Sequence, residues 1–241
     1  DRSAATQAFT FGRNRGVLFN REHETFSLAA GIFNHSDDAT LGVGFNPGAA
    51  SAAPVTTGTA GHGLLYVGRV VIMPFGPAGY SEGDVENGEG GRLDLGAGVV
   101  YDRHRDADFN WDATLDDTST NVLAVESDVT WKLRGKSFQG EFFYRKVSGS
   151  LTPNTRAVGF YAQPGFFIIP SQLELVGRIG WVDPNLDQSN DRVLEAAAAT
   201  NFYFSESHRY KAQVQYSFRK QEQAAGNAHN SFIDLMFQLT I

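Results

Sequence analysis

The sequence has no cysteine in its 241 residues, so it can form neither a disulfide framework nor a thiolate metal site. It has no run near the roughly 18 apolar residues that a membrane-spanning helix needs. Its first residues lack the charged-then-apolar pattern of a signal peptide, so if the protein is exported we expect the signal to have been removed before Asp1. Its 20 Lys and Arg are scattered singly and are outnumbered by 27 Asp and Glu. The net charge of -7 argues against nucleic-acid binding, which depends on clustered basic side chains. The six histidines lack metal-ligand spacing, so no metal or cofactor is expected.

The most prominent feature of the sequence is the alternation of apolar and polar residues. In residues 232–241, five apolar residues alternate with mostly polar ones. The apolar residues are Ile233, Leu235, Phe237, Leu239 and Ile241. A period of two indicates a β-strand with one apolar and one mostly polar face. The apolar faces are too many and too aromatic for a small core. The sequence therefore predicts an all-β, transmembrane antiparallel β-barrel, with apolar side chains in lipid and polar ones in a watery interior.

About eleven segments have this alternation, each near the ~10 residues of a tilted spanning strand. They are residues 13–20, 25–33, 64–73, 92–102, 122–133, 138–147, 157–168, 173–181, 193–204, 210–219 and 232–241. Glycines on the predicted inward faces would leave space in the lumen. The whole chain, residues 1–241, is expected to form one barrel domain.

The connections alternate in length. Short turns fall at 134–137, 170–172 and 205–209, and longer polar links at 103–120, 183–192 and 221–230. Short periplasmic turns facing long external loops are typical of outer-membrane barrels. Residues 36–61 are expected to be the longest external loop and a candidate to fold inward as a constriction. Residues 75–91 break the rule, because they are long yet belong on the periplasmic side, and the rule gives no reason for their length.

The strand count raises a question at the amino end. Counting back from a last strand that runs to the periplasm makes residues 13–20 run inward too, so residues 1–12 begin outside. A barrel normally has an even number of strands and both ends in the periplasm. Either earlier strands precede Asp1, or residues 1–12 are a twelfth strand with no clear pattern.

The later part of the chain resembles a known family. The motifs are GFYAQPGFFIIP at 159–170, LELVGR at 173–178, WVDP at 181–184, FYF at 202–204, HRYK at 208–211, QVQY at 213–216 and IDLMFQL at 233–239. Together they resemble the carboxyl half of the phosphate-selective porin O and P family, over roughly residues 13–241. The resemblance implies an outer-membrane channel of about sixteen strands, usually a homotrimer, that takes up anions such as phosphate passively.

The charges on the predicted inward faces do not form the basic ladder that an anion channel requires. Seven are basic: Arg69, Arg92, Lys132, Arg145, Arg178, Lys211 and Arg219. Eight are acidic: Asp94, Asp102, Glu126, Asp128, Glu141, Glu174, Glu195 and Asp234. These residues are candidates to line the pore, and the near balance predicts weak ion selectivity. The alternative is structural, as cross-strand pairs worth roughly 0.2–1 kcal/mol each.

Aromatic residues on the predicted outward faces fall at strand ends. Tyr101 and Trp181 lie next to long loops, whereas Trp131, Phe204 and Tyr210 lie next to short turns. Two such belts match the headgroup regions on either side of a membrane. The alternative is a soluble β-sandwich, in which the same rings pack between two sheets.

Each candidate catalytic or metal-binding motif in the sequence lacks a part that its chemistry needs. Residues 79–83 fit G-x-S-x-G around Ser81, but a nucleophile elbow needs a strand before it and a helix after it. His35 and Ser36 have no third group to orient them. Residues 183–187 begin like a calcium loop, yet Gln188 and Leu194 replace its turn glycine and bidentate acid. The chain is not expected to be an enzyme.

Three functions remain open on the sequence alone. The first is a water-filled porin for passive diffusion of small ions and solutes, with outer-membrane lipid around it. The second is a plugged barrel that acts as a scaffold or binds a protein partner in the periplasm or outer membrane, which the unusual residues 75–91 favour. The third is an outer-membrane hydrolase, which the motifs disfavour. If the first is right, Arg178→Ala is expected to alter ion preference and leave folding largely intact.

Overall fold

The computed structural model describes residues 5–6, 15–34, 62–79, 81–106, 118–149, 154–205, 209–223 and 226–239. They form one antiparallel sheet of eleven strands, in which each strand lies beside the one before it in sequence. The strands are β1 (Gly16–Glu22), β2 (Phe26–Asn34), β3 (His62–Ile72), β4 (Arg92–Asp106), β5 (Thr118–Leu133), β6 (Lys136–Gly149), β7 (Thr155–Ile169), β8 (Leu173–Asp183), β9 (Val193–Tyr203), β10 (Tyr210–Gln221) and β11 (Ala228–Leu239).

All eleven strands expected from alternation are confirmed, and most of the differences are at their ends. Four strands are longer than the ~10 residues expected of a spanning strand: β4 has 15 residues, β5 has 16, β6 has 14 and β7 has 15. The extra residues pair where alternation has already stopped, for example Arg103 with Asn121. Backbone hydrogen bonding does not need an apolar face, so pairing extends beyond the pattern that predicts it.

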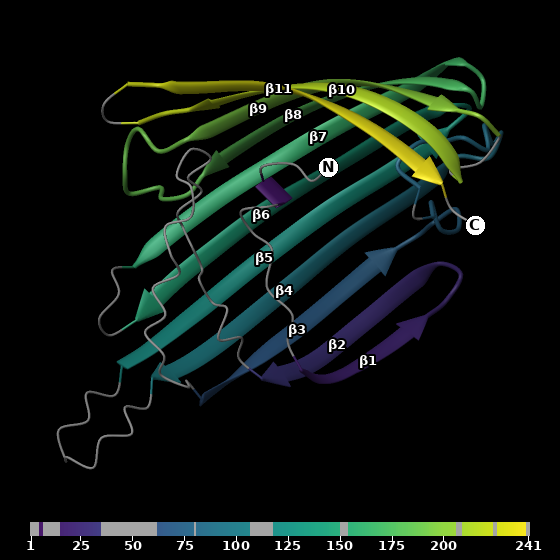
Figure 1. Cartoon of the computed structure of the whole chain (residues 1–241). Helices are drawn as coiled ribbons and strands as arrows, with labels where there is room; N and C mark the ends of the chain where they lie inside the picture. The colour runs from purple at the N-terminus through teal and green to yellow at the C-terminus, as the bar shows by residue number, and fades with distance from the viewer. Residues whose placement is uncertain are drawn as a thin grey trace.

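The sheet is strongly curved and has a concave and a convex side (Figure 1). Within the described residues it is not closed, because β1 pairs only with β2 and β11 only with β10. An all-β sheet of antiparallel neighbours is therefore established, and closure into a barrel remains a prediction. No helix in the described part of the chain is long and apolar enough to cross a membrane.

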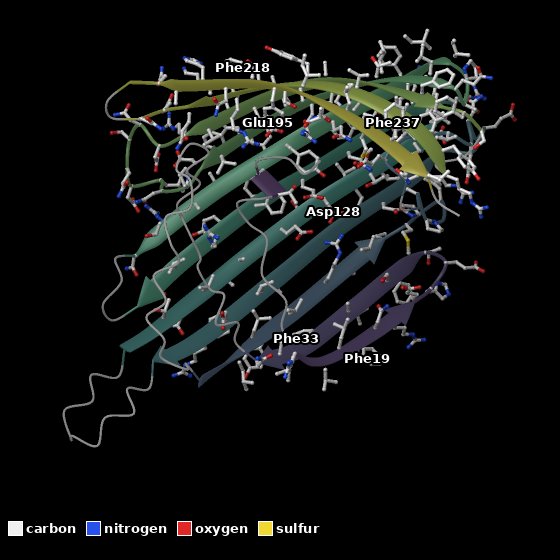
Figure 2. All side chains as sticks on the ribbon, in the orientation of Figure 1. Phe19, Phe33, Asp128, Glu195, Phe218 and Phe237 are labelled. Atoms are coloured by element: carbon white, nitrogen blue, oxygen red, sulfur yellow. The ribbon has the colours of Figure 1, made fainter. Side chains whose placement is uncertain are left out.

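The two faces of the sheet differ in chemistry. Large apolar side chains are exposed on the convex face of every strand from β1 to β11; Val214 on β10 is 52% exposed and Phe237 on β11 is 80% exposed. The concave face carries polar and charged side chains, and Figure 2 shows Asp128 and Glu195 on that side and Phe218 on the other. Apolar side chains on the convex face have no second layer against them in the described structure.

The small apolar core lies on the concave side. Ala5 is completely buried there against a cluster from β6 to β9: Phe143, Ala157, Val182 and Val193, with Tyr161 beside them. The Thr6 hydroxyl donates a hydrogen bond of 3.5 Å to Glu141 Oε2. Ala5 and Thr6 are helical, so the alternative of a strand over residues 1–12 is wrong at these two positions. The other residues of that stretch lie outside the described structure, as do His35, Ser36 and the predicted loop 36–61.

Candidate functional site: the concave face

The strand register places the charged residues with inward parity on the concave face. Glu126 pairs with Phe143, Asp128 with Glu141, and Glu195 with Arg219, so these positions follow one another across neighbouring strands. The same register places the remaining pore-lining candidates on this face: Arg69, Arg92, Lys132, Arg145, Arg178, Lys211, Asp94, Asp102, Glu174 and Asp234. The sequence thus identified the face on which these residues lie, although not the pairs they make.

Arg69 on β3 reaches across β4 to two carboxylates on β5. Its guanidinium donates to Glu126 Oε1 and to Asp128 Oδ2, both at 2.7 Å. The intervening strand has Gly96 and Gly98 on this face. A methyl group at Gly96 would clash with the Asp128 carboxylate and lie 2.7 Å from a guanidinium nitrogen of Arg69. A side chain at position 96 would therefore force the Arg69 and Asp128 side chains, which meet over this glycine, to shift.

Gly96→Ala is expected to destabilise the fold by about 1–3 kcal/mol, the usual cost of forcing atoms into an occupied site. Gly98→Ala is a matched control on the same strand, because the nearest atoms to its methyl group would be 3.7 Å and 3.9 Å away. Equilibrium unfolding of the two variants measures the difference. Equal stability of both variants would contradict the Arg69 geometry.

A second ion network lies on β8, β9 and β10. Glu195 accepts from Arg178 Nε at 2.9 Å and from an Arg219 terminal nitrogen at 2.7 Å. The Glu195 and Arg178 side chains are only 2% and 7% exposed. From the sequence alone, Arg178→Ala is predicted to leave folding largely intact. The burial of this pair predicts a loss of stability instead, because the buried Glu195 carboxylate would have one cation fewer beside it.

Glu174 on β8 is another buried carboxylate, with only 1% of its surface exposed. Its Oε2 accepts hydrogen bonds from Asn201 Nδ2 at 2.9 Å and from the Tyr203 hydroxyl at 2.8 Å. Two donors on the neighbouring strand β9 thus hold this carboxylate on the concave face, which is the usual requirement for burying such a group.

Segment 75–91, which connects β3 to β4, folds onto the concave face. Asp94 accepts from the Ala78 N–H at 3.0 Å. Lys132 Nζ on β5 donates to the Ala78 carbonyl at 2.8 Å and to Ser81 Oγ at 2.6 Å. Further along, the backbone at Gly83 lies so close to the Glu174 carboxylate that a methyl group there would clash with it. The segment therefore crosses the concave face from β4 to β8.

The middle of segment 75–91 is tied to two tight turns. Asp84 Oδ2 accepts from the Gly135 N–H at 2.8 Å, in the turn between β5 and β6. Ser171, in the turn between β7 and β8, donates to the Val85 carbonyl at 2.7 Å. Val85 is 2% exposed. This path gives the physical reason for the segment's length: it has to reach across five strands rather than join two neighbours.

Ser81 and Lys132 form the contact in this site that most resembles catalytic chemistry, because Ser–Lys pairs occur in some hydrolases. The Ser81 hydroxyl, however, donates to the Gly83 carbonyl at 3.1 Å, and Lys132 also bonds the Ala78 carbonyl. No helix follows Ser81 among the described residues of the segment, as a nucleophile elbow requires. The pair fits an anchor that holds the segment better than an activated nucleophile.

The loop after β8 uses its acidic groups in local contacts. Asp183 accepts from Arg192 Nε at 3.1 Å, and Asp187 accepts from Arg156 on β7 at 2.6 Å. Burial raises the pKa of Asp191, and the nearby Asp183 carboxylate raises it further. Two acidic side chains of this stretch are therefore paired with arginines. Within the described residues, no three groups are gathered as metal ligands.

The predicted interface aromatics lie on the convex side, near both ends of the strands. Tyr101 is stacked with Tyr66 of β3 at a ring distance of 6.5 Å, and Trp181 lies 6.0 Å from Phe160 of β7. At the other end Phe204 contacts Phe202 at 4.9 Å, and Trp131 and Tyr210 lie on strands that end at short turns. The structure adds Tyr66, Phe160 and Phe202 to these groups, which the sequence analysis did not single out.

No protein-family model and no curated protein matches the chain. The resemblance to phosphate-selective porins therefore rests on the motifs in residues 159–239 alone.

Proposed function

We propose that the chain is the wall of an outer-membrane porin that lets small ions and solutes diffuse passively through a water-filled lumen. The observation that carries this proposal is the division of the sheet into an exposed apolar convex face and a polar concave face on strands β1 to β11. Soluble proteins rarely expose continuous apolar surfaces of this extent, and a lipid environment removes that cost.

The open edges of the sheet fit the same proposal. Residues of β1 and β11 are exposed on both faces, including Leu18 and Met236 on the concave side. A spanning sheet needs every edge strand paired, because lipid offers no hydrogen bonds to the backbone. In this proposal further strands close the barrel between β11 and β1, as the sixteen-stranded architecture implied by the resemblance requires.

The ion pairs on the concave face favour a weakly selective pore over a phosphate channel. Arg69 is paired with Glu126 and Asp128, and two arginines share Glu195. Basic side chains that are neutralised by neighbouring carboxylates do not form the positive ladder that draws anions through a pore. Phosphate uptake is therefore the less favoured version of the porin proposal.

A scaffold is the second candidate, because segment 75–91 covers part of the concave face. In that proposal the lumen is blocked, and the barrel holds a partner in the periplasm or outer membrane.

Single-channel recording in planar bilayers tests the porin proposal. We expect stepwise conductance from the full-length protein, and a reversal potential near zero in a salt gradient if the strand charges alone decide selectivity. A protein that folds in detergent and inserts but conducts no current would favour the scaffold instead.

A further inference from the structure

Segment 75–91 is held in one position on the concave face by a set of contacts, which together form its seat. Its contacts come from β4, β5 and β8 and from two turns, so it is held at several points along its length. Lys132 is central to this seat because its amino group bonds two residues of the segment and is buried there, at 4% exposure of the residue. A peptide segment bound across the inner wall occupies volume that would otherwise be lumen.

The charges of the segment differ from those of the wall. It contains Glu82, Asp84, Glu86 and Glu89 and no Lys or Arg. Asp84 is buried against the Gly135 N–H, whereas the three glutamates are exposed. Solutes that pass the segment would therefore meet carboxylates, in contrast to the paired charges of the strands.

We propose that segment 75–91 is a fixed constriction of the channel and that Lys132 is the positioning residue that seats it. This inference rests on the proposed porin function. The charged side chains of the constriction are all acidic. With the segment bound in the lumen, the pore therefore prefers small cations over anions. Loss of the seat widens the lumen and moves the carboxylates away from the permeation path.

Lys132→Met in the full-length protein tests the seat. Removing one positive charge from the wall by itself would increase cation preference and leave pore width unchanged. Unseating the segment has the opposite signature, which is higher single-channel conductance together with lower cation preference. We expect the second result. Lys211→Met is the matched control, because Lys211 is an equally buried lysine on the concave face of β10, at 6% exposure.

Gly83→Ala tests the same seat without changing any charge. Its methyl group would clash with the Glu174 carboxylate. That carboxylate is buried and held by Asn201 and Tyr203, so we expect the segment rather than the carboxylate to move and conductance to rise. Gly90→Ala is the control within the segment, because no atom lies within 4 Å of its methyl position, and it should conduct like the unmodified protein.

The outcomes separate this inference from the porin proposal. Unchanged conductance in both Lys132→Met and Gly83→Ala would overturn the constriction while leaving the porin intact. A silent unmodified protein whose Gly83→Ala variant conducts would mean that the segment closes the lumen fully, which supports the seat. Silence in the unmodified protein and in all variants, with folding intact, would overturn both proposals.

Discussion

Replacing Glu195 by glutamine is expected to lower the free energy of unfolding by about 3–5 kcal/mol, the usual cost of removing one member of a buried ion pair. Glu195 accepts from Arg178 and Arg219, and its side chain is 2% exposed. Glutamine keeps the size of the side chain and removes its charge. Both guanidinium groups then remain in a poorly hydrated site next to a neutral amide.

Glu126→Gln is the matched control for this substitution. Glu126 is also bonded to an arginine, but the side chains of Arg69 and Glu126 are 36% and 41% exposed, and Arg69 keeps Asp128. Loss of the Glu126 charge should lower the free energy of unfolding by less than about 1 kcal/mol, as for other solvated ion pairs. Equilibrium unfolding in lipid vesicles compares the two variants, and similar costs would show that Glu195 is as hydrated as Glu126.

Replacing Val214 by arginine is expected to cost about 2–4 kcal/mol when the protein is folded in a bilayer, because the charge enters hydrocarbon near mid-membrane. Val214 lies in the middle of β10, between Thr200 of β9 and Leu235 of β11. Leu235→Arg on β11 should behave in the same way. On a water-exposed sheet the same change would usually cost within 0.5 kcal/mol, a value typical of surface substitutions.

Gln213→Arg is the control for Val214→Arg. Gln213 is the preceding residue on β10 and lies on the concave face, in register with Asn201. An arginine there meets the watery side and should be tolerated. The free energies of unfolding in vesicles give the comparison, and equal tolerance at the two positions would contradict the assignment of the faces.

The strands could be predicted from the sequence because side-chain direction alternates along a strand whatever its surroundings. That rule correctly placed Val214 and Gln213 on opposite faces, and it placed the charged residues of inward parity on one face of the sheet. It could not give the ends of β4 or β5, where backbone pairing continues through polar residues such as Arg103 and Asn121.

The seat of segment 75–91 could not be predicted for a different reason. Its contacts join residues far apart in the sequence, such as Ser171 with Val85 and Lys132 with Ala78. No local pattern encodes such contacts. The one signal in the sequence was the length of the segment, which did not fit a short periplasmic turn.

The central claim is that the convex face meets hydrocarbon and the concave face meets water. Because the chain has no cysteine, single cysteines introduced at positions 212–217 of β10 can each carry one nitroxide label. Electron paramagnetic resonance in vesicles then reports how accessible each label is to oxygen, which dissolves in lipid, and to a polar relaxation agent. We predict that labels at Ala212, Val214 and Tyr216 are accessible to oxygen and that the label at Gln213 is accessible to the polar agent. Gln215 and Ser217 are 5% and 1% exposed on the concave side, so labels there should be poorly accessible to both. Equal access of the polar agent to all six labels would contradict the account.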